Sequence, residues 1–359
     1  MKNYKIIDFY ITKKFLGTFF YAIALLLSIS IVFDFSENID EFLAKDIPVK
    51  DIIFDYYLNF IPYFGNLFSP LFIFVAVIYF TSKMAYNTEI IAILSSGVSY
   101  SRLMRPYLVS ALVLAALSFT LGHYVIPQAN KTMIYFRWKY INDERVITER
   151  NIHRQIEPGV YIYMQSFNTN NIGYRFTMET FDGAKLVEKL TADNIRWDAE
   201  SQKWIINNYW KRIIHDDHEE FERGYRIDTT LNMVPGDYNL IKNQMETYTT
   251  PTLKKEISLM KLRGVNYVEW ELEKYRRTAG PFSAFILTII GAGLASRKIK
   301  GGLGFHLGLG LGLSFSYIFF MQVSTVFAIN GNTPPLLAVW IPNIIYSFIA
   351  FFVFRWAAR

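Results

Sequence analysis

Long apolar runs occupy both ends of this chain, and a polar stretch separates them. A helix needs about 20 apolar residues to cross a bilayer. Runs near this length lie at residues 15–33, 56–80, 107–126, 281–295, 303–329 and 336–354. The fourth run reaches a spanning length only with Gly280 and Ser296. The first is too long for a cleaved signal peptide and lacks a small-residue cleavage site. We therefore predict six transmembrane helices in a 3 + 3 arrangement.

Between the two groups, the pattern changes to short runs rich in aromatic and β-branched residues. Examples are GVYIYMQS at 159–166 and WIINNYWKRII at 204–214, with polar turn clusters between the runs. Such spacing is typical of an antiparallel sandwich or roll. We expect aromatic residues such as Trp197 and Trp204 to fill its core. Past Pro235, Ser258 is expected to cap a short helix that Gly264 ends.

These changes of pattern divide the chain into four parts. The first transmembrane half covers residues 1–126, an all-β domain 127–257, amphipathic connecting helices 258–280, and the second transmembrane half 281–359. We expect an integral membrane α-helical protein with six transmembrane helices and an inserted β domain.

Composition supports this division. Of the 359 residues, 52% are hydrophobic and 19% are charged, below the share of about 25% in average soluble proteins. The stretch 127–278 holds 23 of the 37 Lys and Arg and 22 of the 31 Asp and Glu. This balance argues against a soluble enzyme. The absence of cysteine excludes disulfides and thiolate metal sites.

Basic residues in short loops predict the orientation, since Lys and Arg favour the cytoplasmic side. They gather in the N-terminal tail, in the loops after the second and fourth runs, and in the C-terminal tail: Lys2, Lys5, Lys13, Lys14, Lys83, Arg102, Arg105, Arg297, Lys298, Lys300, Arg355 and Arg359. The opposite loop, 36–51, has two Lys against five acidic residues. We expect both termini in the cytoplasm and the β domain outside. The net charge of +6 thus reflects topology rather than nucleic-acid binding.

Features that would carry chemistry are scarce. The middles of the spans contain no Asp, Glu, Lys or Arg, which weakens an ion-coupled pump, and no GxxxxGK[ST] phosphate loop occurs. Gly304, Gly308 and Gly312 recur every four residues, which favours close helix packing over a nucleotide site. His215-Asp216-Asp217-His218 favours a solvated hairpin turn, because HxxH is a weak metal signal without a third fixed ligand. We expect no metal and no cofactor bound by this chain.

The loop after the second span is more informative. Asn87 or Thr88 can cap a helix there, Glu89 suits its first turn, and Gly97 can end it. Ile90, Ile93 and Leu94 would line one face as an exposed apolar stripe. Such a helix, about 87–97, either lies on the membrane surface or inserts into a groove on a soluble partner.

Several segments together resemble the LptF/LptG permease family, which supplies transmembrane subunits of the lipopolysaccharide-export ABC transporter. NTEIIAILSSGVS at 87–99 resembles the family's coupling helix, and ADNIRWDAESQKWIIN at 192–207 its exported domain. Glu273-Lys274 followed by Pro281-Phe282 resembles the entry to the fourth span. LAVWIPN at 337–343 resembles the start of the sixth. The matches cover nearly the whole chain in the right order.

The resemblance implies a β-jellyroll periplasmic domain, a second permease subunit, a cytoplasmic ATPase dimer that binds ATP and Mg²⁺, and a periplasmic lipid relay. It places the ATPase contact at the coupling helix, in residues Thr88, Glu89, Ile90, Ile93, Leu94 and Gly97. Acidic residues stand at the outer end of the first span, so phosphate binding is not transferred there. Lys274, Arg276 and Arg277 are the candidates for the lipid headgroup, although interface anchoring is their more ordinary role.

The sequence thus favours a non-catalytic permease subunit in the bacterial inner membrane. An alternative is a membrane-anchored periplasmic module that binds or senses a ligand. A third reading, an intramembrane enzyme acting on lipids, lacks a polar catalytic set within the spans. Whether the chain is F-like or G-like, and whether it pairs with a paralogue or with itself, is not encoded in these motifs.

Overall fold

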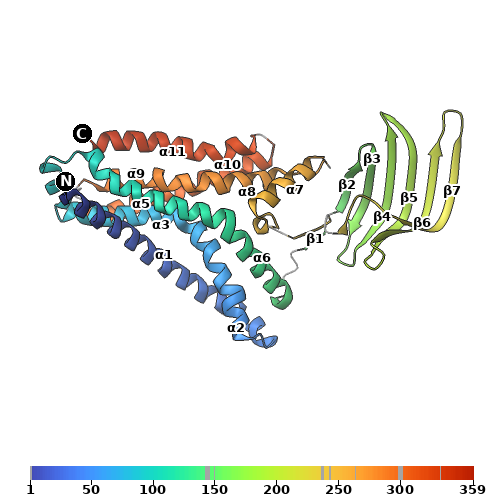
Figure 1. The fold of residues 1–359 in the computed structure, drawn as a ribbon, viewed down its shortest axis with the longest axis horizontal. Helices are drawn as coiled ribbons and strands as arrows, with labels where there is room; N and C mark the ends of the chain where they lie inside the picture. The colour runs from blue at the N-terminus through green and yellow to red at the C-terminus, as the bar shows by residue number, and fades with distance from the viewer. Residues whose placement is uncertain are drawn as a thin grey trace. The chain divides into compact units, whose positions relative to one another are not determined.

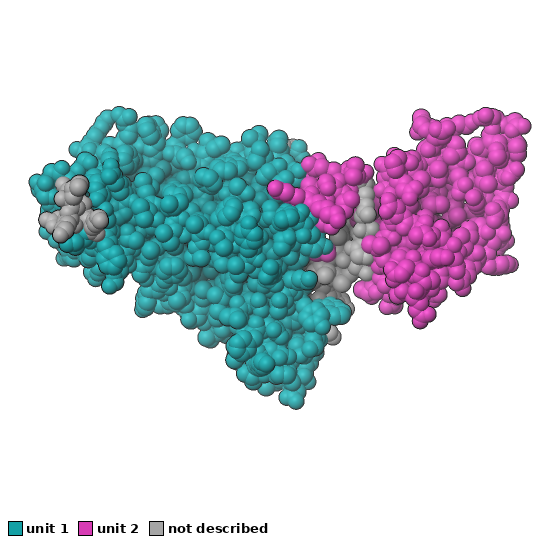
Figure 2. Space-filling view, viewed as in Figure 1, with its two compact units in different colours: residues 1–142, 245–253, 268–359 teal, residues 143–244, 254–267 magenta. Residues whose placement is uncertain are grey.

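The computed structural model describes residues 2–141, 146–148, 150–235, 238–241, 244–262, 264–297, 302–331 and 333–359. The chain forms two compact units (Figure 2). The helical unit comprises Met1–Asn142, Met245–Leu253 and Val268–Arg359. The β unit comprises Asp143–Gln244 and Lys254–Tyr267.

Six helical segments among the described residues are long and apolar enough to cross a membrane, which confirms the prediction of six spans. They are Ile6–Ala44, Val49–Tyr86, Tyr100–Ile141, Val268–Ala295, Leu307–Ile329 and Pro335–Ala357. Three precede the β unit in sequence and three follow it.

Several spans are built from consecutive helices, and Figure 1 labels most of the α-helices among them. Their bounds are α1 (Lys2–Ala44), α2 (Val49–Asp51), η1 (Ile52–Tyr57), α3 (Leu58–Tyr86), α4 (Glu89–Ser95), α5 (Tyr100–Thr120), η2 (Leu121–Val125), α6 (Ile126–Phe136), η3 (Arg137–Ile141), η5 (Gln244–Thr247), α7 (Thr250–Leu262), α8 (Val268–Ala279), η6 (Gly280–Phe282), α9 (Ser283–Ala295), α10 (Gly302–Ile329) and α11 (Pro335–Ala357).

Helical structure extends further than the apolar runs. The third segment passes Pro127 and continues to Ile141, and α8 leads through η6 into α9. Both Pro127 and Pro281 occupy the first turn of a new helix. Proline is tolerated there because its missing N–H would have no helical acceptor. The fourth span is therefore a 28-residue segment, although its apolar run is short.

The connecting helix α7 also starts earlier than predicted. It begins at Thr250, so Ser258 lies inside the helix and donates to the carbonyl oxygen of Lys255, and the expected cap at Ser258 was wrong. Pro251 in the first turn and the backbone bond from Leu253 to Thr249 explain the earlier start.

The helical unit is held together by aromatic packing and one buried amide. Phe15 of α1 stacks on Phe80 of α3 at 5.6 Å between ring centroids, and Phe80 stacks on Tyr107 of α5 at 5.2 Å. Asn343 of α11 accepts from the Tyr317 hydroxyl at 2.8 Å and donates to the carbonyl oxygen of Ala279 at 2.9 Å. Asn343 is 2% exposed, so this pair of bonds fixes α10 and α8 against α11 without water.

The β unit contains a six-stranded antiparallel sheet in the order β2-β3-β4-β5-β6-β7 (Figure 1). The strands are β2 (Arg150–Glu157), β3 (Val160–Phe167), β4 (Ile172–Asp182), β5 (Lys185–Asp198), β6 (Lys203–Ile214) and β7 (Glu219–Thr229). Strand β1 (Val146–Thr148) pairs separately with β8 (Asn239–Ile241). The inserted all-β domain is therefore confirmed.

One face of the sheet carries the core of the β unit. Trp204 is fully buried, lies 5.1 Å from the ring of Trp197, and donates from Nε1 to the carbonyl oxygen of Met233 at 2.9 Å. Tyr238, which follows the sheet in sequence, packs on Phe167 at 5.0 Å. The predicted role of Trp197 and Trp204 in the core is confirmed.

Candidate functional site

The loop between the second and third spans forms α4, close to the predicted helix. Gly97 has φ = +89°, a conformation that favours glycine, and ends the helix as expected. Thr88, one of the two predicted cap residues, takes the N-cap position, but its side chain makes no capping hydrogen bond. Thr88 takes a left-handed conformation with φ = +61°, and its hydroxyl donates to the carbonyl oxygen of Asn87. Asn87 Nδ2 donates to the Glu89 carboxylate at 3.3 Å.

The apolar stripe of α4 is not exposed. Ile90 is 1% exposed, and Ile93 and Leu94 pack against the same core, which α1, α3, α5 and α9 form. The prediction of an exposed stripe was wrong because the stripe finds its apolar partners within the helical unit. Ile91, at 53% exposed, lies on the outward face. Any docking on α4 would therefore use Glu89, Ile91 and Ala92.

Two contacts hold α1 against this region. The Tyr10 hydroxyl donates to Oε2 of Glu89 at 3.1 Å. The Arg102 guanidinium of α5 donates to both carboxylate oxygens of Asp8, at 2.8 and 2.7 Å. A bidentate pair of this kind fixes orientation as well as distance. Glu89 thus ties α4 to α1, and Arg102 ties α5 to α1. Tyr10 gave no signal in the sequence pattern.

At the opposite end of α1, acidic and aromatic residues form a polar network. Asp34 accepts from the hydroxyls of Tyr56 and Tyr57, both at 3.1 Å, and Arg137 donates to the Tyr56 hydroxyl at 3.1 Å. The carboxylate of Asp34 is therefore engaged by protein groups. These hydrogen bonds join the first three spans, near the end of the first, the start of the second and the end of the third.

A cavity of about 210 Å³ lies within the helical unit, among α3, η2, α8, η6 and α10. Its wall combines apolar side chains with a polar group of residues: Tyr63, Asn66, Ser118, Glu246, Glu273, Arg276, Arg277 and Gln322. Ser118 donates to Asn66 at 2.6 Å across this wall. Apolar walls with a charged rim suit an amphiphilic ligand.

The three basic headgroup candidates have different surroundings. Arg277 is 6% exposed and donates to Glu273, to the carbonyl oxygen of Tyr248 and to that of Met245. Its guanidinium is thus used in holding residues 245–248 to α8. Lys274 lies 3.9 Å from Glu271 and above the ring of Tyr275 at 4.1 Å. Arg276, whose side chain is 44% exposed, forms a long 3.8 Å pair with Glu273. Of the three, Arg276 is the most available to a ligand.

The glycines of α10 divide into two faces. A Cβ atom added to Gly304, Gly308 or Gly312 would meet nothing within 4 Å in the described structure. At Gly310 the same atom would lie 2.4 Å from Cδ1 of Ile78. Close packing within this chain therefore uses Gly310. The close packing predicted for Gly304, Gly308 and Gly312 stays a prediction, and it would need a second chain as the partner.

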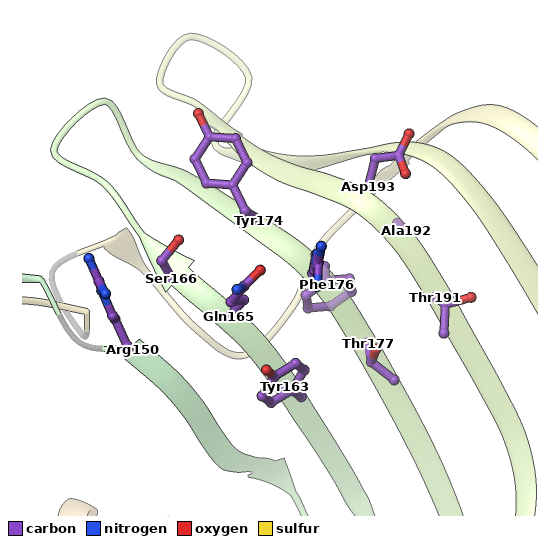
Figure 3. Close-up of a pocket in the computed structure, with 11 residues that line it drawn as sticks. Arg150, Tyr163, Gln165, Ser166, Tyr174, Phe176, Thr177, Thr191, Ala192 and Asp193 are labelled. Atoms are coloured by element: carbon purple, nitrogen blue, oxygen red, sulfur yellow. The ribbon is translucent and has the colours of Figure 1, made fainter.

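The polar face of the sheet is hollowed by a wide groove of about 1040 Å³ (Figure 3). Its floor lies on β3, β4 and β5, and Tyr163, Gln165, Tyr174 and Thr191 project from these strands. Arg150 of β2 stands at one side. The groove therefore offers aromatic and hydrogen-bonding groups on an open surface.

Left-handed residues recur at one level of this sheet. Asn151, Arg175 and Asn208 have φ of 55°, 50° and 51°. The register sets Arg175 and Asn208 on either side of Asp193, whose carboxylate accepts from Asn208 Nδ2 at 2.9 Å. Such conformations cost about 1–3 kcal/mol each in non-glycine residues and gather at functional sites. Sequence alternation alone did not reveal them.

Six spanning helices around shared apolar cores, with an inserted β domain, define a multi-pass membrane protein. Residues 9–356 match the family of the lipopolysaccharide export system permease LptF/LptG. Because the match covers nearly the whole chain, the chain belongs to this family, whose members are membrane permease subunits. No curated protein matches the sequence.

Proposed function

We propose that this chain is a non-catalytic subunit of an ATP-driven transporter that extracts lipopolysaccharide from the inner membrane and passes it to a periplasmic relay. Membership of the export permease family supports lipopolysaccharide as the substrate. The sequence has no phosphate loop of the GxxxxGK[ST] type, so ATP and Mg²⁺ would be bound by a cytoplasmic ATPase dimer. A second permease, a paralogue or another copy, would complete the lipid path.

The placement of α4 is the observation that carries this proposal. One face of the helix is embedded in the core through Ile90, and the other presents Ile91 outward. A force applied by a docked ATPase would reach α1, α3 and α5 directly, because packed cores transmit displacement with little compression. A helix resting on lipid headgroups would not require such an anchor.

The excess of basic residues near α4 and both termini supports a cytoplasmic location for these parts. The cavity beside Arg276 then lies toward the periplasmic ends of the spans, where a lipid phosphate would meet the guanidinium. The open face at Gly304, Gly308 and Gly312 would receive the second permease.

Replacement of two outward residues tests the proposal. Glu89→Lys and Ile91→Asp should each reduce co-purification with the ATPase and lipid release from membranes. The thermal stability of Ile91→Asp should stay unchanged, because Ile91 is 53% exposed. Leu262→Asp is the control, since Leu262 is an exposed apolar residue of α7. Unchanged ATPase association together with unchanged lipid release would contradict the proposal.

The groove on the sheet favours one alternative, a membrane-anchored module that binds a periplasmic ligand. Deletion of residues 87–97 separates the two. A binding module should retain its ligand affinity after this deletion, whereas an exporter should lose transport.

A further inference from the structure

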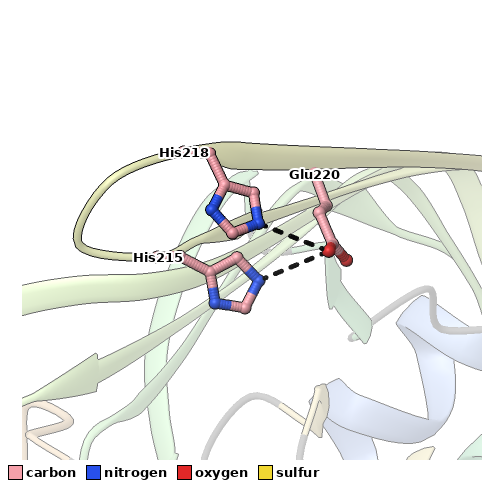
Figure 4. A group of neighbouring side chains, drawn as sticks. All are labelled: His215, His218 and Glu220. Carbon is pink, nitrogen blue, oxygen red and sulfur yellow. Dashed lines mark ion pairs between the residues drawn. The ribbon is translucent and has the colours of Figure 1, made fainter.

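The hairpin between β6 and β7 brings three metal-ligating side chains together (Figure 4). His215 and His218 belong to the turn, and Glu220 lies near the start of β7. Oε1 of Glu220 lies 3.8 Å from Nε2 of His215 and 3.5 Å from Nε2 of His218. The three ligand atoms all lie within 4.8 Å of one another. The HxxH motif thus gains a third ligand, which adjacency in sequence did not identify.

The backbone and the neighbouring ion pairs fix this geometry. His215 N donates to the carbonyl oxygen of His218 at 2.9 Å, and the two rings stack at 4.5 Å between centroids. Arg212 engages Glu219, and Lys185 engages Asp216. Basic side chains therefore occupy the flanking carboxylates, while in the described structure Glu220 faces only the two imidazoles.

A second carboxylate orients His218. Its Nδ1 lies 2.7 Å from Oδ1 of Asp217. A proton on Nδ1 suits this contact, and it leaves the lone pair of Nε2 directed at Glu220. Carboxylate–histidine pairs of this kind orient imidazole ligands in zinc sites. Nε2 of His218 and Oε1 of Glu220 lie 3.5 Å apart, a separation that one shared cation can bridge.

We propose that His215 Nε2, His218 Nε2 and Glu220 Oε1 bind one zinc-type divalent transition-metal ion. Zinc bonds of about 2.0–2.1 Å in tetrahedral geometry place ligand atoms about 3.4 Å apart, close to the separations from Glu220. Two imidazole ligands favour zinc, copper or nickel over magnesium and calcium, which prefer oxygen. The ion would clamp the tip of the hairpin that carries the edge strand β7, and its fourth position would accept water or a donor from another molecule.

The test uses the full-length protein in detergent, purified through a tag without histidine. Isothermal titration with ZnCl₂ should give one saturable site. The double variant His215→Gln/His218→Gln should lose this site, and Glu220→Gln should weaken it. Asp217→Asn should lower affinity about tenfold or more if its carboxylate orients His218. His153→Gln is the matched control, because His153 lies in β2 of the same sheet, outside the cluster.

Thermal unfolding with and without metal tests whether zinc binding stabilises the folded protein. Zinc should raise the thermal midpoint of the wild-type protein and of His153→Gln, and leave the double variant unchanged, whereas MgCl₂ should shift none of them. Equal zinc affinity in the wild type and the double variant would overturn the proposal. A wild-type protein without a saturable zinc site would overturn it as well.

Discussion

Arg277 Nη1 donates to the carbonyl oxygen of Tyr248 at 2.7 Å, which ties α8 to a segment 29 residues earlier in the chain. Nη2 of the same guanidinium donates to the carbonyl oxygen of Met245, and Nε to Glu273. One buried side chain thus fixes the turn that leads back into the helical unit. A lysine could not make these three contacts, since its ammonium lacks the planar fork of arginine.

Arg277→Ala should therefore destabilise the protein by about 2–4 kcal/mol, because it leaves two carbonyl oxygens and the Glu273 carboxylate without their donor. Thermal unfolding in detergent would measure the loss. Arg276→Ala is the matched control, and a change below about 1 kcal/mol is expected for its half-exposed side chain. Equal effects of the two substitutions would show that Arg277 does not hold this segment.

Replacement of two neighbouring isoleucines of α4 should change the stability of the protein to very different extents. Ile90→Ala should lower stability by about 2–4 kcal/mol, since it opens a cavity in the core that α4 shares with α1, α3 and α5. Ile91→Ala should change it by less than about 1 kcal/mol, because Ile91 is 53% exposed. Thermal unfolding of both variants in the same detergent is the measurement. A larger loss of stability for Ile91→Ala than for Ile90→Ala would show that Ile91, and not Ile90, faces the core.

The two faces of α10 give a further contrast. Gly310→Val should destabilise the lone chain, because its side chain would overlap Ile78. Gly308→Val should leave the lone chain unchanged, since an added Cβ meets nothing within 4 Å in the described structure. If a second permease packs on this face, Gly308→Val should reduce its co-purification. If the Gly308→Val variant still co-purifies with the second permease, Gly308 does not lie in the interface.

The core of the β unit should depend on one tryptophan. Trp204→Ala should cost about 3–5 kcal/mol, because it removes a fully buried ring and leaves the carbonyl oxygen of Met233 without its donor. Limited proteolysis with increasing urea would report the loss. Trp210→Ala is the control, since Trp210 lies further along the same strand and is 52% exposed. Equal protease resistance of Trp204→Ala and the wild type would contradict this role.

The β6–β7 hairpin should weaken in acid. Arg212 donates to Glu219, and this bond holds the pKa of Glu219 below its ordinary value of 4.5. The pair therefore contributes stability above that value and loses it as the pH falls through the lowered pKa. Hydrogen exchange of β6 and β7 should accelerate as the pH is lowered through this window, after correction for the intrinsic rate. Glu219→Gln should flatten the dependence, and an unchanged profile would exclude this pair as its cause.

Much of this architecture follows from the sequence alone. The length of the apolar runs predicted six spans, because a bilayer demands about 20 apolar residues of any helix that crosses it. The alternation around Trp197 and Trp204 predicted the strands, and four short motifs indicated the permease family. These properties depend on residues near one another in the chain, so local patterns reveal them.

The tertiary structure decided which faces and partners these residues have. It turned Ile90 into the core, left Gly308 without a neighbour within 4 Å in the described structure, and bound Arg277 to the carbonyl oxygen of Tyr248. A helical stripe has the same sequence whether lipid, another protein or its own core covers it. The choice depends on contacts between residues far apart in sequence, and periodicity carries no record of them.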